Sequence, residues 1–358
     1  MKTQIFFSVL IMIIFLFNGC LNNQSHGIQA PETPNYSVQI QLLNIDTENP
    51  MTDTKIFVRG IQLLFETDSD WQEKTSDSSG TFLFEKLVPG GWKIQIFEQD
   101  CYITTHKITI VNRDTSFALR IPQALITRER YKLPGGMKEK WFEAGICWKE
   151  PGVCATLGTW KVDSESGDEF SRLFEGDFQD GFEVVGSKVF EVENPDFSGL
   201  VWAAPNYYTF TGTLDNPQIC LLDRKTGKVV GRGKAPHRLI DLAWDGEYFW
   251  GTATHSKILK FSPYSFTLKF EYPAPAQHPG GIAWDGRNLW SYDTETQWLY
   301  KHGDGMNPIR TFCLVFQDEY YENWTLNEIK YMAFDFEKNL YVLDPTGHFV
   351  YQFSIPEN

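Results

Sequence analysis

Short segments of alternating apolar and polar residues recur through most of the chain, separated by Gly, Pro, Asn and Asp. A period of two residues is typical of half-buried β-strands, and the separating residues are typical of turns. Segment 167–174 is an exception, because its apolar residues have helical spacing and predict one short helical turn. The pattern as a whole predicts an all-β protein.

The most regular part of this pattern is a repeat in the second half of the chain. Octets 243–250 and 283–290 both read A-W-D-G-x-x-(F/L)-W and start 40 residues apart, and 333–341 is a weaker copy. Asp-Gly between two apolar runs predicts a hairpin turn, because Gly accepts a positive φ and Asp hydrogen-bonds its own backbone. About 40 residues with four short strands is the size of a propeller blade. The repeat residues are Trp244, Asp245, Gly246, Trp250, Trp284, Asp285, Gly286 and Trp290.

These octets resemble the bacterial β-propellers of the NHL and glutaminyl-cyclotransferase-like group. The resemblance implies a propeller over 141–358, with four to five blades visible. We expect the repeat tryptophans to pack between blades, with ligand stacking as the alternative role. Trp202 aligns with Trp250, on the second strand of an earlier blade, and 206–217 is interpreted as a long aromatic-rich loop.

The last blade of the repeat ends at 349–354 with its third strand, so its outermost strand must come from elsewhere in the chain. An unpaired strand edge invites aggregation, and ring closure pairs that edge with a strand from the other end of the propeller. We expect 156–162 to supply the missing strand, with 141–148 as the alternative.

A second motif precedes the repeat. Residues 80–94 read G-x-F-x-F-x-x-L-x-P-G-x-W-x-I and resemble the carboxypeptidase-regulatory-like domain, a small seven-stranded β-sandwich. The resemblance implies a sandwich over 36–123 that carries no catalytic residues. By the period of two, Phe82 and Phe84 point into its core. A charged stretch containing Pro-Gly-Gly then predicts a linker over 124–140.

The N-terminal segment predicts secretion and a lipid anchor. A positive start is followed by an apolar run that is too short for a comfortable transmembrane helix. Its end, F-N-G-C, resembles a bacterial lipobox, with Phe17 where Leu is usual. The resemblance implies a signal peptide over 1–19, lipidation of Cys20 and a lipidated tether over 20–35; a signal peptide with an incidental cysteine is the alternative. Leu21 would direct the protein to the outer membrane in a Gram-negative host.

The composition and the cysteines exclude some classes of partner and cofactor. A net charge of −14 argues against nucleic acid, because phosphate binding needs a basic face. The sequence has no second long apolar run, so the lipid anchor is the only expected contact with a membrane. Cys147 and Cys154 flank a turn-rich loop and are candidates for a disulfide in an oxidising compartment. The cysteines and histidines lack metal-binding spacing, and we expect no metal and no cofactor.

Candidate chemistry recurs in the loop that precedes the first strand of each repeat. His237, His278 and Glu328 lie there, six or seven residues before the first aromatic residue of the octet. Loops of this kind surround one mouth of a propeller channel, so the three side chains could bind a metal or serve as acid and base. Unrelated polar loop residues are the alternative. Nucleophile motifs are absent from the sequence, and catalytic residues stay unassigned.

These inferences predict an envelope lipoprotein whose propeller binds an unknown protein or glycan without catalysis. The alternative is a propeller enzyme, glutaminyl-cyclotransferase-like or a lyase, that acts at the channel mouth. A purely structural envelope component is the third possibility.

Overall fold

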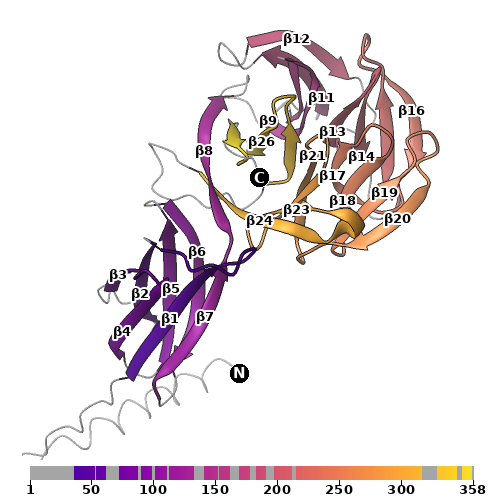
Figure 1. Cartoon of the computed structure of the whole chain (residues 1–358). Helices are drawn as coiled ribbons and strands as arrows, with labels where there is room; N and C mark the ends of the chain where they lie inside the picture. The colour runs from indigo at the N-terminus through magenta and orange to yellow at the C-terminus, as the bar shows by residue number, and fades with distance from the viewer. Residues whose placement is uncertain are drawn as a thin grey trace, which may run out of the picture.

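The computed structural model describes residues 36–356 apart from 53, 62–71, 88–89, 99–100, 111–112, 133–140, 152, 162–168, 178–182, 191–196, 212–214, 317–328 and 345–348. These residues form strands β1 to β27 and one short 3-10 helix, η1 (Asp304–Met306), so the expected all-β fold is confirmed (Figure 1). Within this part of the chain, no helix is long and apolar enough to cross a membrane.

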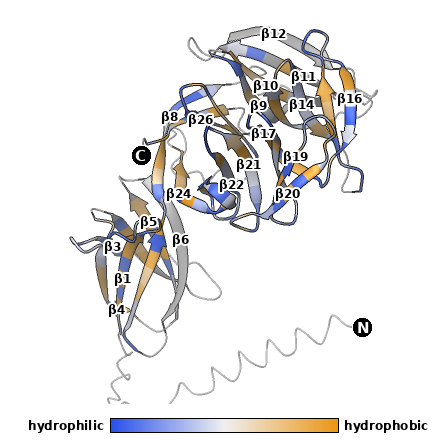
Figure 2. Cartoon of the chain, turned by 45° about the vertical axis from the view of Figure 1, so that its right-hand side comes forward, coloured by the Kyte–Doolittle hydropathy of each residue, from blue (hydrophilic) through white to orange (hydrophobic). Residues whose placement is uncertain are grey.

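The first part of the fold is a β-sandwich. One sheet has the order β4-β1-β7 and the other β3-β2-β5-β6. The strands are β1 (Tyr36–Asn44), β2 (Lys55–Ile61), β3 (Gln72–Thr75), β4 (Thr81–Leu87), β5 (Gly90–Glu98), β6 (Cys101–Ile110) and β7 (Thr115–Ile121). Apolar and polar residues alternate along most of β1 (Figure 2), and Phe82, Phe84 and Trp92 lie in the core as the motif predicts.

The described residues from Gln123 onward form a propeller of five blades, each with four strands. Blade 1 has β9 (Trp141–Glu150), β10 (Val153–Lys161), β11 (Glu169–Asp177) and β12 (Glu183–Phe190), and blade 2 has β13 (Ser198–Ala203), β14 (Asn206–Thr211), β15 (Gln218–Leu222) and β16 (Val229–Lys234). Blade 3 has β17 (Leu239–Trp244), β18 (Phe249–Ala253), β19 (Lys257–Phe261) and β20 (Leu268–Pro273), and blade 4 has β21 (Pro279–Trp284), β22 (Leu289–Asp293), β23 (Trp298–His302) and β24 (Pro308–Val315). Blade 5 has β25 (Tyr331–Phe334), β26 (Asn339–Asp344), β27 (Phe349–Ser354) and β8 (Gln123–Lys132).

The five blades form a closed ring. Their innermost strands, β9, β13, β17, β21 and β25, contact one another in turn, and β25 also contacts β9. Each pair of neighbouring blades shares one hydrophobic cluster, because both faces of every blade are apolar. Trp250 lies in the cluster between blades 3 and 4, and Trp290 in the cluster between blades 4 and 5. Burial of these large aromatic residues stabilises the ring.

Strand β8 closes the ring. Its first half pairs parallel with β24, from Phe312 opposite Gln123 to Val315 opposite Ile126. Its second half pairs antiparallel with β27 and supplies the outermost strand of blade 5. The expected donor, 156–162, is wrong, because β10 already pairs on both edges within blade 1. The expected linker over 124–140 is also wrong for 124–132, where apolar residues at the start of the segment favour a strand.

The sandwich packs directly against blade 4. Only Pro122 separates β7 from β8, which runs from the sandwich into the propeller (Figure 1). Cys313 of β24 belongs to the sandwich core, and Trp298 packs against it. The backbone nitrogen of Thr311 also donates a 3.0 Å hydrogen bond to Oδ2 of Asp46. The two parts are therefore joined through side chains as well as through the chain.

Two local expectations were wrong. Segment 167–174 falls largely in strand β11, where ladder pairing with β10 and β12 overrides the helical spacing of its apolar residues. In blade 2, Trp202 was expected on the second strand, but it lies on β13, the innermost strand. Residues 206–211, expected as part of a loop, form the second strand of this blade. Trp202 is therefore equivalent to Trp244, and not to Trp250.

Candidate functional site

Each innermost strand of the propeller carries one aromatic residue near its C-terminal end. These five residues, here called the aromatic mouth, are Trp148, Trp202, Trp244, Trp284 and Phe334. All five line a single cavity of about 360 Å³ at one end of the central channel. The four tryptophans are half-buried, so part of each ring is accessible to solvent. A cavity of this size is within the range that binds small organic ligands.

A second layer of aromatic residues holds most of the mouth in place. Four of its five rings pack against an aromatic residue from a second strand of the same or the neighbouring blade. The pairs, with their centroid distances, are Trp148–Tyr341 at 4.9 Å, Trp202–Tyr207 at 4.7 Å, Trp244–Phe249 at 4.9 Å and Phe334–Trp290 at 5.5 Å. Because these partners are buried or half-buried, they hold the rings of the mouth in place before a ligand binds. Binding therefore costs little side-chain entropy.

Two of the repeat turns at the edge of the cavity share one hydrogen-bond geometry. Oδ1 of Asp285 accepts the backbone N–H groups of Arg287 and Asn288, at 2.8 and 2.6 Å, and its Oδ2 accepts the indole N–H of Trp290 at 2.7 Å. Asp245 makes the same set of bonds with its own turn and with Trp250. The repeat Asp therefore fixes both the turn after the inner strand and the buried tryptophan that follows.

Apolar residues make up the floor and walls of the cavity. Leu242, Ile282 and Met332 lie there, each from an inner strand two residues before the aromatic residue of the mouth. Next to them in the chain, Asp241 is fully enclosed and its Oδ2 accepts the backbone N–H groups of Ile282 and Met332, at 3.0 and 3.2 Å. Burial raises the pKa of the Asp241 carboxyl, although these hydrogen bonds oppose the shift. Asp241 thus joins three inner strands beneath the cavity.

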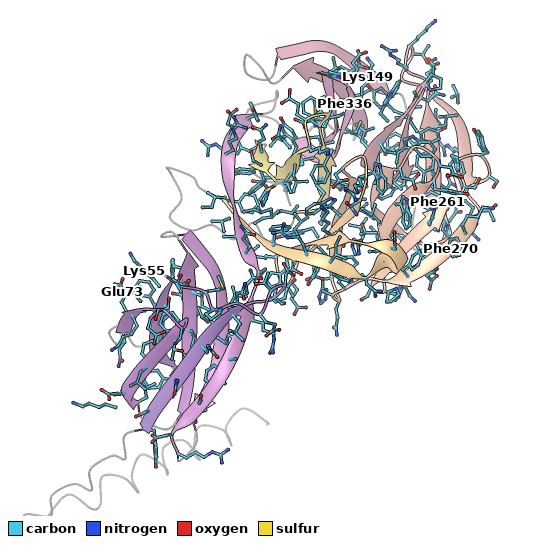
Figure 3. All side chains as sticks on the ribbon, in the orientation of Figure 1. Lys55, Glu73, Lys149, Phe261, Phe270 and Phe336 are labelled. Atoms are coloured by element: carbon cyan, nitrogen blue, oxygen red, sulfur yellow. The ribbon has the colours of Figure 1, made fainter. Side chains whose placement is uncertain are left out.

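The charged groups of the cavity lie at its rim. Asp285, Asp335 and Lys338 contribute to the lining, together with the exposed ring of Phe336, which Figure 3 labels. Like Asp285, Asp335 accepts three donors from its own turn, the backbone nitrogens of Glu337 and Asn339 and the side-chain amide of Asn339. The rim therefore carries two negative charges and one positive charge around an apolar interior.

The histidines predicted from the sequence lie at the other end of the inner strands. His237 and His278 precede β17 and β21, whereas the aromatic mouth is at the C-terminal ends of these strands. The structure does not give them a shared partner: Nε2 of His237 lies 3.2 Å from Glu271, and Nδ1 of His278 lies 2.7 Å from Glu295. Glu328 and Cys20 lie outside the described residues. Among the described side chains, no cluster of His, Cys, Asp and Glu could hold a metal ion.

The disulfide expected between Cys147 and Cys154 is wrong. Both thiols are free and buried. Across β9 and β10, Cys154 pairs with Trp148, while Cys147 pairs with Ala155, so the two side chains point to opposite faces of blade 1. Cys147 packs toward blade 2 and Cys154 toward blade 5. Burial raises the pKa of both thiols, which disfavours the reactive thiolate.

Sequence reasoning missed the aromatic mouth as a set. The signal was present, because an aromatic residue follows a small or apolar residue at the end of every inner strand. In blades 3 to 5 the octets show it directly. In blade 2 the register error hid Trp202, and in blade 1 the repeat is too diverged to align Trp148 by its sequence.

Comparisons with known proteins give little beyond this architecture. No family model and no curated protein matches the chain. A glutaminyl cyclase from Myxococcus xanthus is similar in structure, with a TM-score of 0.47 and 8% identity over 65% of this chain and 97% of that one. A chain of the mitotic checkpoint complex has a TM-score of 0.40 with 10% identity over 67% and 98%, and the WD40 propeller domain of Doa1 has 0.39 with 9% identity over 63% and 97%. The five-bladed architecture described above follows from strand pairing alone.

Proposed function

We propose that this protein is a non-catalytic binding protein whose propeller takes its ligand, a protein or a glycan component, in the aromatic mouth. The observation that carries this proposal is the convergence of one aromatic residue from each of five inner strands on one cavity. Residues that serve only to pack blades are buried between them, as Trp250 and Trp290 are. Half-exposed tryptophans around a cavity are typical of ligand-binding sites.

A binding role fits the chemistry of the lining better than catalysis. General acid–base catalysis needs a side chain that is free to exchange a proton with the substrate. The lining carboxylates, Asp285 and Asp335, instead accept three hydrogen bonds each from their own turns and, for Asp285, from the indole of Trp290 on the following strand. The alternative, an enzyme at the opposite mouth, draws support from the His237–Glu271 and His278–Glu295 pairs.

The proposal includes a lipid anchor in the bacterial envelope. The lipobox-like sequence that ends in Cys20 supports it, and Leu21 favours the outer membrane in a Gram-negative host. In this arrangement the tether over 20–35 holds the sandwich and propeller away from the bilayer. Cys20→Ala should stop lipid attachment and release the protein into the soluble fraction. Unchanged membrane fractionation would contradict the anchor without affecting the binding proposal.

Binding is tested with the double variant Trp244→Ala and Trp284→Ala. Envelope glycans and envelope proteins are screened for binding to the wild-type protein, and each ligand found is retested on the variant. The variant should lose binding, whereas Tyr264→Ala, at a side chain that is 96% exposed and outside the cavity, should keep it. Retained binding in the double variant would reject the mouth as the site. Turnover of a bound ligand that depends on His237 and His278 would favour the enzyme.

A further inference from the structure

We propose that the group bound inside the aromatic mouth is a quaternary ammonium ion of the choline type. This inference rests on the aromatic mouth as the ligand site of the proposed function, and it assigns that site to a lipid headgroup or a soluble choline compound in place of a protein or glycan. The group would enter the cavity with its methyl groups against the aromatic faces. Three features of the described residues support this choice over a sugar ring. They are the enclosing arrangement of the rings, the scarcity of neutral hydrogen-bond acceptors and the state of the rim carboxylates.

The arrangement of the rings fits a compact cation. Five aromatic residues approach the cavity from five directions, one from each blade. The face of an aromatic ring is electronegative, so several faces around one volume attract a cation together, and aromatic cages recognise quaternary ammonium groups in this way. A sugar, by contrast, stacks its flat face on one or two rings and presents hydroxyl groups around its edge.

The lining offers few partners for such hydroxyl groups. Among the described residues that line the cavity, none carries a hydroxyl, carboxamide or imidazole group, and the neutral side-chain donors are the indole N–H groups of the four tryptophans, which cannot accept hydrogen bonds. The walls are instead aliphatic, as at Leu242, Ile282 and Met332, with the thiol of Cys147 as a weak donor. A polyol bound there could accept hydrogen bonds from the indoles, but its own hydroxyl hydrogens would find no strong neutral side-chain acceptor, which is costly. A quaternary ammonium ion has no hydrogen-bond donor to satisfy.

The rim carboxylates can attract a cation although their oxygens are engaged. Both oxygens of Asp285 and both oxygens of Asp335 already accept hydrogen bonds within their turns. These bonds reduce the lone pairs left for a sugar hydroxyl, but the negative charges remain and act over several ångströms. Lys338 is the opposing charge at the rim, and it is exposed to solvent. A second cation, the Arg224 guanidinium, lies 5.7 Å from the centroid of the Trp202 ring but does not line the cavity. The balance of charge among the lining residues therefore favours a cation.

The first test compares choline with 3,3-dimethylbutan-1-ol, in which carbon replaces the charged nitrogen at nearly the same shape. Both are titrated into the whole protein and followed by tryptophan fluorescence and by calorimetry. Choline should bind saturably and at least about tenfold more tightly than the neutral alcohol, because only the cation gains from the aromatic faces. Equal affinities, or no binding of choline, would overturn the inference.

The charge at the rim supplies a second test, because neutralising it should change the affinity for a cation in one direction. Lys338→Met should tighten choline binding several-fold and leave the neutral alcohol unaffected, and added salt should reduce this difference. The matched control is Lys225→Met, which removes an exposed lysine from a turn of blade 2 outside the cavity. Weaker choline binding in Lys338→Met would contradict a cationic ligand. Trp284→Ala should abolish choline binding while thermal unfolding stays cooperative.

The remaining arms identify the source of the cation and separate this inference from the proposed function. Glycerophosphocholine and phosphatidylcholine vesicles test a lipid headgroup, with phosphatidylglycerol vesicles as control, and free choline tests a soluble ligand. Binding to either source supports the inference. If a methyl glycoside binds in a Trp284-dependent manner and choline does not, the mouth is a ligand site but the cation inference fails. If envelope ligands bind the double tryptophan variant as well as wild type, the proposed site fails too.

Discussion

The indole nitrogen of Trp290 donates a hydrogen bond of 2.7 Å to Oδ2 of Asp285, the residue that turns β21 into β22. The same bond, also 2.7 Å, joins Trp250 to Asp245 one blade earlier. In both blades one carboxylate therefore ties a surface turn to a tryptophan buried between blades. The rim of the aromatic mouth and the inter-blade core share this contact, so the position of one depends on the other.

The first prediction removes this contact in blade 4. Asp285→Ala should lower the free energy of unfolding by about 3 kcal/mol, because it leaves the buried indole nitrogen without its acceptor and frees the turn. Urea denaturation measures the change. Asp223→Ala is the matched control, since Asp223 accepts the backbone nitrogens of Lys225 and Thr226 in a similar turn but bonds no indole. Equal losses in the two variants would show that the indole bond contributes nothing.

The second prediction concerns pH. Burial raises the pKa of the Asp241 carboxyl above its ordinary value of 3.8. The folded protein then binds this proton more tightly than the unfolded chain, so the stability that Asp241 contributes is complete below the unfolded pKa and is lost as pH rises through the folded pKa. Relative to Asp241→Asn, the wild-type protein should become less stable as pH rises above about 4.

The control for this prediction is Asp223, whose contribution to stability should change with pH in the opposite direction. Hydrogen bonds from Thr226 lower the pKa of Asp223, so its contribution is present above its unfolded pKa and lost as pH falls. Urea denaturation over a pH series for wild type, Asp241→Asn and Asp223→Asn separates the two effects. A constant difference between wild type and Asp241→Asn at all pH values would contradict the shift at Asp241.

The third prediction tests ring closure by β8. A chain that begins at Trp141 lacks β8 and leaves the edges of both β24 and β27 unpaired, which should cause aggregation or a large loss of thermal stability. A chain that begins at Pro122 lacks the sandwich but keeps β8, and it is the control. Similar solubility and melting of the two shortened chains would contradict the role of β8.

The fourth prediction concerns the free thiols of blade 1. The wild-type protein, unfolded without reductant in the presence of iodoacetamide, should carry the alkyl label on both Cys147 and Cys154. In the folded protein both should react slowly, because they are buried and their thiolate forms are disfavoured. Peptide mass spectrometry reads both states. A cross-linked peptide containing the two cysteines would contradict the structure.

Sequence pattern predicted the parts of the fold that rest on local chemistry. The octets 243–250 and 283–290 determine a hairpin from Asp-Gly alone, and the sandwich motif places Phe82 and Phe84 by the period of two. Where local signals were ambiguous, pairing with distant strands decided the outcome. The helical spacing at 167–174 is such a case, because its segment lies between two strands of one blade.

The candidate site was harder to predict because it is not local. The five aromatic residues of the mouth come together only when all five inner strands are placed in register, and no short motif encodes that register. The first tryptophan of each octet packs against an inter-blade cluster as expected, but Trp244 and Trp284 also stay half-exposed at the cavity, which the expectation did not include. Closure of the ring by an earlier strand was predicted, but the donor strand was wrong for the same reason, since β8 and β27 lie at opposite ends of the propeller sequence.

The position of β8 also determines when the propeller can be completed during synthesis. β8 is the first propeller strand to leave the ribosome, and its partner β27 is the last. Blades 1, 2 and 3 are built from successive hairpins and can fold as they emerge, because each strand pairs with its neighbour in the sequence. Blade 5 depends on the most distant pairing in the propeller, which is the slowest kind to form. Until that pairing forms, the nascent propeller has unpaired strand edges that can bind other chains. The chain is therefore most prone to aggregation before β27 pairs with β8.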